Sequence, residues 1–113
     1  MTTMNESEFE AMADAELARV EQAFETSGVD VDIEPKPGGV LEIEFADGSK
    51  MIINRHGAAR EIWVAARSGG FHFRPDGRQW RDTRDRMELY TALSRLASEQ
   101  SGGPVTLVRP EAD

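Results

Sequence analysis

Residues 38–55 read GGVLEIEFADGSKMIINR, two alternating runs of apolar and polar residues joined by a tight turn. Leu41, Ile43 and Phe45 occupy every second position of the first run, so they point to one face of a strand. Asp47-Gly48 is a strong signal for a hairpin turn, because these residues tolerate a positive φ. The segment therefore predicts two antiparallel strands, Val40–Phe45 and Lys50–Arg55.

The period of two continues on both sides of this hairpin. Val29, Val31 and Ile33 alternate with acidic residues before it, and the prolines of Pro35–Gly39 suit a turn beside an edge strand. Later strands are separated by turns at Gly69-Gly70 and at 75–77. The strands predicted outside the hairpin are 29–34, 61–67, 71–74 and 79–82. Such short connections join antiparallel neighbours, so we expect a meander of five or six strands over about 29–82.

A helix is predicted over about 7–27, where the apolar residues change to the helical period. Asn5 with Glu8, or Ser7 with Glu10, offers a capping box at its start, and Gly28 is a natural end. The apolar stripe consists of Phe9, Ala13, Leu17, Val20 and Phe24.

A second helix is predicted over about 85–100 from Leu89, Leu93 and Leu96, with Asp85 and Glu88 able to cap its start, and a C-terminal tail follows over 104–113. Both helices need an apolar surface, and one face of the sheet can supply it. The sequence therefore predicts a single α+β domain over 1–113. It is a two-layer α/β sandwich with the N- and C-terminal helices packed on one face of a five- to six-stranded antiparallel sheet, and the other face is open to solvent.

Composition restricts the class of protein. The 113 residues include no cysteine, which excludes disulfides, thiolate catalysis and cluster ligation by cysteine. No apolar run approaches the roughly 18 residues of a membrane span, and the acidic start MTTMNESEFEAM does not resemble a signal peptide. The net charge of −8 disfavours a nucleic-acid binder. We therefore expect a cytoplasmic protein with no membrane or nucleic-acid partner.

The acidic residues are concentrated at the start of the chain. Residues 1–34 contain ten acids and one base, whereas residues 55–86 contain eight arginines and four acids. Four acids of the first predicted helix fall within about 60° of arc beside its apolar stripe, and three more share one face of the next strand. These candidate metal ligands are Glu10, Asp14, Glu21, Glu25, Asp30, Asp32 and Glu34.

A surface that offers only carboxylates attracts hard or borderline cations weakly and discriminates poorly among them. Asp30-x-Asp32-x-Glu34 begins like a calcium loop, but Pro35 and Leu41 stand where such a loop needs glycine and glutamate. Two other interpretations of the acidic face stay open. It is either a solvated surface or a docking site for a basic patch of another protein.

Trp63 is predicted to lie on the solvent side of the sheet, because Ile62 and Val64 alternate with it as core residues. Asn54 shares that outer face on the preceding strand. An exposed tryptophan is a common anchor for a protein partner. The alternative is an ordinary cross-strand pair that covers apolar surface.

No catalytic constellation is present in the sequence. His56 and His72 belong to no recognisable triad or metal-ligand motif, and no GxSxG segment is present to hold a nucleophilic serine. We therefore expect a protein that is not an enzyme.

The chain resembles the frataxin family, specifically its bacterial branch. The resemblance covers residues 5 to about 109 and is carried by NESEF (5–9), GGVLEIEFADGSKMIINR (38–55), IWVA (62–65) and GGFHF (69–73). It implies an αβββββ(β)α sandwich and a role in iron handling for iron–sulfur cluster assembly. Members of the family bind ferrous and ferric iron weakly on an acidic ridge. They also contact the cysteine desulfurase and the scaffold complex and regulate the assembly rate. Bacterial members are usually monomers that can aggregate with iron.

The resemblance also implies roles for individual residues. His56 stands where many members have glutamine, and Gln22, Thr26 and Ser27 leave the ridge thinner than in acid-rich relatives. The implied iron ligands are Glu21, Glu25, Asp30, Asp32 and Glu34, extended by Asp14 and Glu10. The implied partner surface consists of Glu21, Glu25, Asn54 and Trp63.

Two functional hypotheses follow. In the first, the protein is an iron-binding regulator or donor of cluster assembly that acts by binding and not by turnover. Because the ligands are exposed oxygens, we expect other divalent or trivalent cations to substitute for iron. In the second, the protein is an acidic adaptor of the assembly complex, and its association with metal is incidental.

Overall fold

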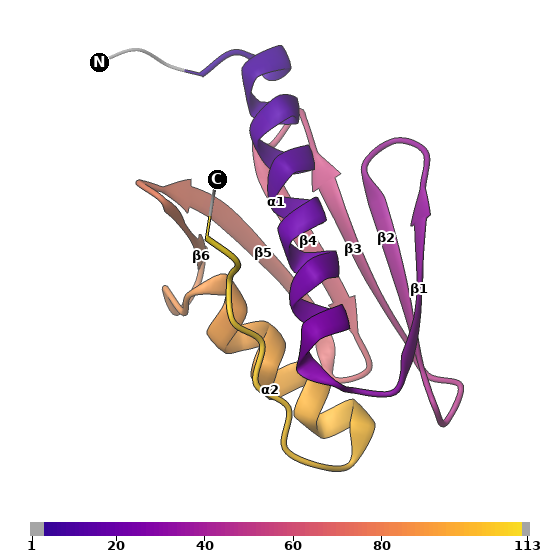
Figure 1. Cartoon of the computed structure of the whole chain (residues 1–113). Coiled ribbons are helices and arrows are strands. Elements are labelled where there is room, and N and C mark those ends of the chain that lie inside the picture. The colour runs from indigo at the N-terminus through magenta and orange to yellow at the C-terminus, as the bar shows by residue number, and fades with distance from the viewer. Residues whose placement is uncertain (1–3, 112–113) are drawn as a thin grey trace.

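The computed structural model describes residues 4–111, and the outermost residues of the expected domain and of its tail, 1–3 and 112–113, lie outside that range. Six strands pair antiparallel in chain order, β1 to β6, and both helices cover one face of the sheet (Figure 1). This confirms the expected two-layer α+β sandwich. The elements are α1 (Glu6–Ser27), β1 (Val31–Lys36), β2 (Val40–Phe45), β3 (Lys50–His56), β4 (Glu61–Ala66), β5 (Gly69–Asp76), β6 (Gln79–Asp82) and α2 (Leu89–Ser101).

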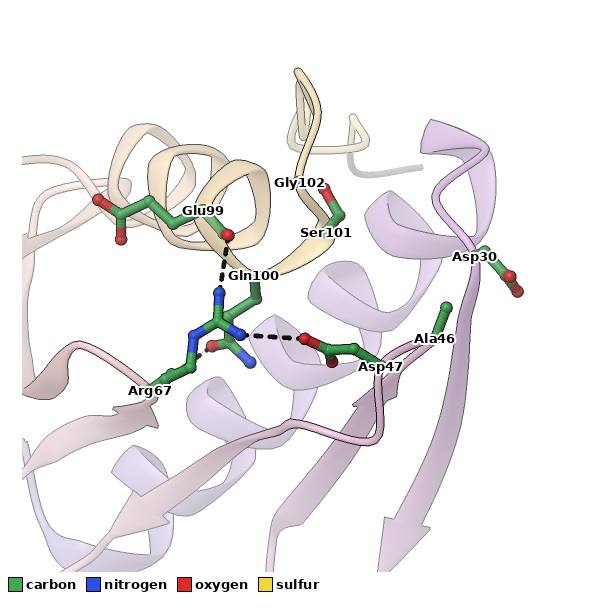
Figure 2. Close-up of a pocket in the computed structure, with 8 residues that line it drawn as sticks. All are labelled: Asp30, Ala46, Asp47, Arg67, Glu99, Gln100, Ser101 and Gly102. Atoms are coloured by element: carbon green, nitrogen blue, oxygen red, sulfur yellow. Dashed lines mark hydrogen bonds and ion pairs between the residues drawn. The ribbon is translucent and has the colours of Figure 1, made fainter.

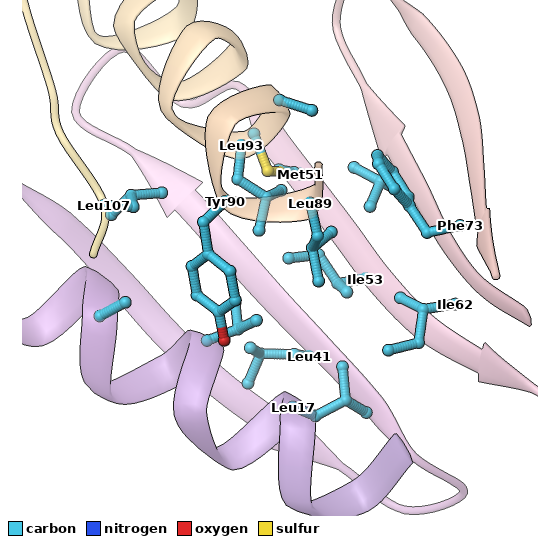
Figure 3. Close-up of a cluster of buried hydrophobic side chains, with 14 of the residues drawn as sticks. Leu17, Leu41, Met51, Ile53, Ile62, Phe73, Leu89, Tyr90, Leu93 and Leu107 are labelled. Carbon is cyan, nitrogen blue, oxygen red and sulfur yellow. The ribbon is translucent and has the colours of Figure 1, made fainter. Parts of the chain in front are cut away.

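One hydrophobic core lies between the helices and the inner face of the sheet. The strand side chains that point inward do so at every second position, as their alternation requires. Leu17 of α1 and Leu89 of α2 meet Ile53 and Ile62 of the sheet in this layer (Figure 3). The hydrophobic stripes of both helices are therefore buried, and the other face of the sheet, here called the outer face, carries no helix.

The ends of α1 are fixed by local interactions. The Asn5 side chain accepts a hydrogen bond from the Glu8 backbone at 2.7 Å, and Glu8 Oε1 accepts one from the Asn5 backbone at 3.0 Å. This is the first of the two capping boxes suggested by the sequence. At the other end, Gly28 adopts a φ of 82°, a left-handed conformation that favours glycine.

The expected start of α2 near residue 85 is wrong. The helix begins at Leu89, because the Glu88 carboxylate accepts hydrogen bonds from the backbones of Tyr90 and Thr91. Asp85 instead stabilises the preceding turn, where its side chain accepts from the Met87 backbone at 3.0 Å. Both Asp85 and Glu88 are able to cap a helix, and Glu88, which lies next to the buried Leu89, is the one that does so.

Several strand boundaries also differ from the expectation. The turn expected at 75–77 begins only after Asp76, because Pro75 and Asp76 belong to β5 and pair with Trp80 and Gln79. Pro35 and Lys36 belong to β1 and pair with Leu41 and Val40, because β1 is an edge strand on which proline needs no ladder partner for its nitrogen. The turn after β4 lies at 67–68, so Gly69 and Gly70 already belong to β5. Asp30 consequently precedes β1 rather than lying within it.

The tail after α2 is attached to the rest of the molecule by side chains of both helices. The hydroxyls of Ser94 and Ser98 accept hydrogen bonds from the backbones of Leu107 and Val105, each at 2.9 Å. Leu107 is buried in the core (Figure 3). These contacts carry the chain back past α2 to the side of α1.

A buried carboxylate completes this attachment. Glu16 of α1 is 1% exposed and accepts two hydrogen bonds from the Arg109 guanidinium, at 2.9 and 2.8 Å, and one from the Tyr90 hydroxyl at 2.6 Å. Burial by itself would raise the pKa of Glu16, but the hydrogen bonds from Arg109 and Tyr90 outweigh it and hold the pKa below its usual value. Glu16 is therefore an ionised group that links α1, α2 and the tail.

Replacing Arg109 with alanine should lower the free energy of unfolding by roughly 2 kcal/mol at pH 7, because it removes the main charged partner of a buried carboxylate. The deficit should shrink in acid. Since folding lowers the Glu16 pKa, the stability that this group contributes is present above its usual pKa of 4.5 and lost as the pH falls through the lower folded value. Urea unfolding followed by circular dichroism, at pH 7 and below pH 4, measures both effects.

The matched control is Arg95→Ala, at an exposed arginine of α2. It should change the free energy of unfolding by no more than about 0.5 kcal/mol. A deficit for Arg109→Ala that equals that of the control, or that is the same at both pH values, would contradict the proposed link.

Candidate functional site

Two acidic side chains of α1, Asp14 and Glu21, lie on the flank of the helix that faces β1 and β2. Asp14 and Glu21 line a shallow groove of about 270 Å³ together with Lys36 and Val40 of those strands. Glu25, one turn beyond Glu21, is exposed. Because residues four apart are neighbours on a helix, Glu21 and Glu25 present a pair of carboxylates to solvent.

Arg55 occupies the end of this acidic flank nearest the start of α1. From β3, its Nε lies 2.7 Å from Asp14 Oδ1 and its Nη1 lies 3.7 Å from Glu10 Oε2. The arginine reaches α1 over Gly39, which has a φ of 76° and where an added Cβ would overlap the Arg55 side chain. Two of the seven candidate ligands, Glu10 and Asp14, therefore already have an internal counter-ion. Asp14 raises the pKa of Arg55 through this hydrogen bond, so the guanidinium stays charged.

The acids of β1 lie on a different surface from those of α1. Val31 and Ile33 pack against the core, so Asp32 and Glu34 point to the outer face of the sheet. In register, Asp32 lies opposite Glu44 and Glu34 lies opposite Glu42.

Cations of the same face balance part of this charge. Glu42 is held by Lys36 at 2.9 Å and by Lys50 at 3.1 Å, and its pKa is lowered first by the hydrogen bond from Lys36. Our sequence reasoning missed Glu42 and Glu44. The alternation in VLEIEF would have placed both on the outer face if the two strands had been set in register.

Asp30 lies at the end of the molecule where α1 leads into β1. It borders a hollow of about 360 Å³ between the β2–β3 turn and the end of α2. Arg67 crosses this hollow, with one nitrogen 3.0 Å from Asp47 Oδ2 and another 2.8 Å from the backbone oxygen of Glu99, while Asp30 is turned away (Figure 2). Asp30 is therefore separated from the ion pair between Arg67 and Asp47.

The seven candidate ligands thus occupy separate parts of the surface. Within residues 4–111, no three histidine, aspartate or glutamate side chains converge in a geometry that could hold a metal ion. What the arrangement offers to a cation is pairs of carboxylates, on α1 at Glu21 and Glu25 and across β1 and β2 at Asp32 and Glu44.

Trp63 lies on the outer face as predicted, directly opposite Asn54 in register. It is half-buried, because an imidazole covers each face of the indole. The His56 ring lies 3.8 Å from it at an angle of 11°, and the His72 ring lies 4.5 Å away at 10°. We call His56, Trp63 and His72 the three-ring stack. Its exposed part is the edge of the indole rather than its faces.

Glu61 anchors this stack from below. It is 4% exposed and accepts hydrogen bonds from Trp63 Nε1 and Arg74 Nε, both at 2.7 Å, while His72 Nδ1 lies 3.4 Å away. Burial by itself would raise the pKa of Glu61. The hydrogen bonds from Trp63 and Arg74 outweigh burial, so the pKa lies below its usual value and the carboxylate is charged. The sequence did not reveal Glu61, because a glutamate at the start of a strand is ordinarily exposed.

Charge changes sign across the outer face. The β1–β2 edge carries the acids of both strands, whereas Arg74 of β5 lies opposite Arg81 of β6. The three-ring stack lies between these regions, on β3, β4 and β5. The charge asymmetry along the sequence therefore corresponds to a separation between the two edges of this face. None of the helices described is both long enough and apolar enough to cross a membrane.

Comparison with known proteins identifies the family. The sequence model of the frataxin-like domain matches residues 2–103. The chain is 61% identical over 104 residues to a protein of Dechloromonas aromatica named iron–sulfur cluster assembly protein CyaY, covering 92% of this chain and 99% of that protein. A protein of the same name from Ralstonia nicotianae is 55% identical over 111 residues, covering 96% and 98% of the two chains.

A solved structure agrees with these sequence matches. The frataxin of Psychromonas ingrahamii, described as a model for stability modulation within the CyaY family, superposes with a TM-score of 0.85 at 34% identity. The match covers 94% of this chain and all of that one. A two-helix sandwich on a six-stranded sheet, a family match over most of the sequence and full-length relatives thus agree, and the chain belongs to the frataxin-like family.

Proposed function

We propose that this protein takes part in iron–sulfur cluster assembly as an iron-binding regulator that works by binding and not by turnover. The observation that carries the proposal is the match over nearly the full length of both chains to relatives named for that process. The acidic flank of α1 and the outer face of the sheet supply two chemically different surfaces for it. We further propose that it acts in the cytoplasm as a monomer that can oligomerise with iron.

The proposed iron ligands are carboxylates at the surface. Glu21 and Glu25 form the part of the α1 flank that Arg55 does not reach, and we assign to them the first contact with ferrous or ferric iron. Asp30, Asp32 and Glu34 extend the ligand set around β1. Oxygen ligands of this kind bind hard cations with water left in the shell, so binding should be weak and shared with other divalent or trivalent ions.

The proposed partners are the cysteine desulfurase and the cluster scaffold. We assign the acidic flank to the desulfurase, because the negative charge of Glu21 and Glu25 attracts a basic patch over long range. We assign the outer face around Asn54 and Trp63 to another part of the complex. There the three-ring stack offers a rigid aromatic edge that costs little conformational entropy to bind.

One observation supports the second hypothesis, an adaptor with incidental metal binding. Several of the acids have internal cations: Arg55 faces Glu10 and Asp14, and two lysines hold Glu42. A protein-binding surface tolerates such pairing, whereas a metal ligand must give it up. Metal and partner titrations of the same variants separate the two hypotheses.

Manganese titrated into the ¹⁵N-labelled protein should broaden the amide signals around Glu21 and Glu25 first. The double variant Glu21→Gln/Glu25→Gln should weaken this binding by about fivefold, because it removes two of the charges that attract the ion. Arg55→Gln should have the opposite effect. It frees Glu10 and Asp14, so broadening should spread toward the start of α1.

Glu99→Gln serves as the control, since it removes one exposed carboxylate from α2, outside the proposed ligand set. Broadening centred on His56 and His72, or an affinity that the double variant leaves unchanged, would contradict the proposed iron surface.

Binding to the desulfurase should depend on salt, and binding through Trp63 should depend on it less. Glu21→Lys with Glu25→Lys should slow association with the desulfurase and flatten its dependence on ionic strength. Trp63→Ala should preserve that salt slope and weaken the complete assembly complex by about 2 kcal/mol. Surface plasmon resonance at several salt concentrations, with a reconstituted cluster-assembly assay, measures these effects.

Circular dichroism first establishes that Trp63→Ala folds. Glu99→Lys, a charge reversal on α2 outside the acidic flank, controls for a single Glu→Lys change in net charge. If Trp63→Ala folds and every contact is unaffected, the outer face is not a partner surface. If the wild-type protein neither binds the desulfurase nor changes the rate of cluster assembly, the proposed function itself is wrong.

A further inference from the structure

A groove on the side of the molecule away from the acidic flank is lined by three arginines. It has a volume of about 780 Å³ and lies between α1, the β5–β6 turn and the C-terminal tail. Arg19 comes from α1, Arg78 from the turn and Arg109 from the tail, and Trp80 forms part of the lining. In a chain with a net charge of −8, three guanidinium groups from three distant segments border one hollow.

The guanidinium groups retain hydrogen-bond donors for a ligand. Arg109 uses Nε and Nη2 to bind Glu16, which leaves its Nη1 free of that carboxylate. Arg19 contacts Glu16 through Nη1 alone, at 3.5 Å. Arg78 is exposed, and none of the ion pairs found among residues 4–111 includes it. The side chains of Arg19 and Arg109 are 26% and 34% exposed, so both also meet solvent.

Glu16 gives this cluster a fixed geometry. It is buried, ionised and bonded to both Tyr90 and Arg109, so Arg109 does not need to be ordered when a ligand arrives. Glu111 also lines the groove and lies in none of the ion pairs of the described residues. Three positive charges therefore face two carboxylates, of which one is fully occupied, and the groove keeps a surplus of positive charge.

We propose that this groove is a binding site for a small oxyanion, a phosphate or a carboxylate, held by Arg78 together with Arg19 and Arg109. The planar fork of a guanidinium matches two oxygens of such an anion, and arginines that converge from different elements enclose it from several sides. The site is separate from the iron and partner surfaces, and it does not depend on the proposed function.

The test is a titration of the ¹⁵N-labelled full-length protein with sodium phosphate and, separately, with sodium succinate, both at constant ionic strength against sodium chloride. The backbone amides of 77–79, Val108, Arg109 and Glu111 and the Nε–H signals of the three arginines should shift in a saturable way. Millimolar affinity is expected for an exposed site. Arg78→Ala and Arg19→Gln should each weaken binding at least fivefold, whereas Arg95→Ala, at an exposed arginine of α2, should not.

Arg78→Ala should fold like the wild type, since Arg78 is exposed and belongs to none of the described ion pairs, and circular dichroism checks this. Saturable shifts with phosphate alone identify a phosphate site, and with succinate alone a carboxylate site. Saturation with both identifies a general oxyanion site. The proposal would be overturned if the shifts saturate with neither anion. It would also be overturned if Arg78→Ala and Arg19→Gln bind the anion as tightly as the control Arg95→Ala does.

Discussion

Packing of α1 on the inner face of the sheet is the contact on which every surface of this protein depends. Once Phe9, Val20 and Phe24 are buried, the rotation of the helix about its axis is fixed. The flank toward β1 and β2 then presents acids, and Glu16 is turned toward the tail. Because strand side chains alternate, filling the inner face also forces Asn54 and Trp63 onto the outer one.

Pairing of charges shapes what these surfaces can bind. Arg55 occupies one end of the acidic flank, and Arg109 neutralises Glu16 inside the protein. What remains is an acidic flank at Glu21 and Glu25, an aromatic edge in the middle of the outer face and an arginine-lined groove on the opposite side of α1. These three surfaces differ in charge and chemistry, so they suit different ligands.

Features set by neighbouring residues were predictable from the sequence. The hairpin around Asp47-Gly48, the apolar stripe of α1 and the Asn5–Glu8 capping box each depend on residues within one or two turns of one another. The outward direction of Trp63 followed from simple alternation. The errors occurred at the ends of elements. At the start of α2, Asp85 and Glu88 were equally suitable as caps, and burial of Leu89 favoured the start after Glu88.

The sequence by itself therefore determined the order of elements, the two-layer packing and the side of the sheet on which Asn54 and Trp63 lie, because hydrophobic periodicity and capping are local. Only the tertiary structure decided which charges meet. Arg55 is 41 residues from Asp14, and Arg109 is 93 residues from Glu16. No spacing in the chain encodes such pairs. They arise because packing the helices on the sheet brings long, flexible side chains from distant segments within reach of one another, and only then is a carboxylate left free or given a counter-ion.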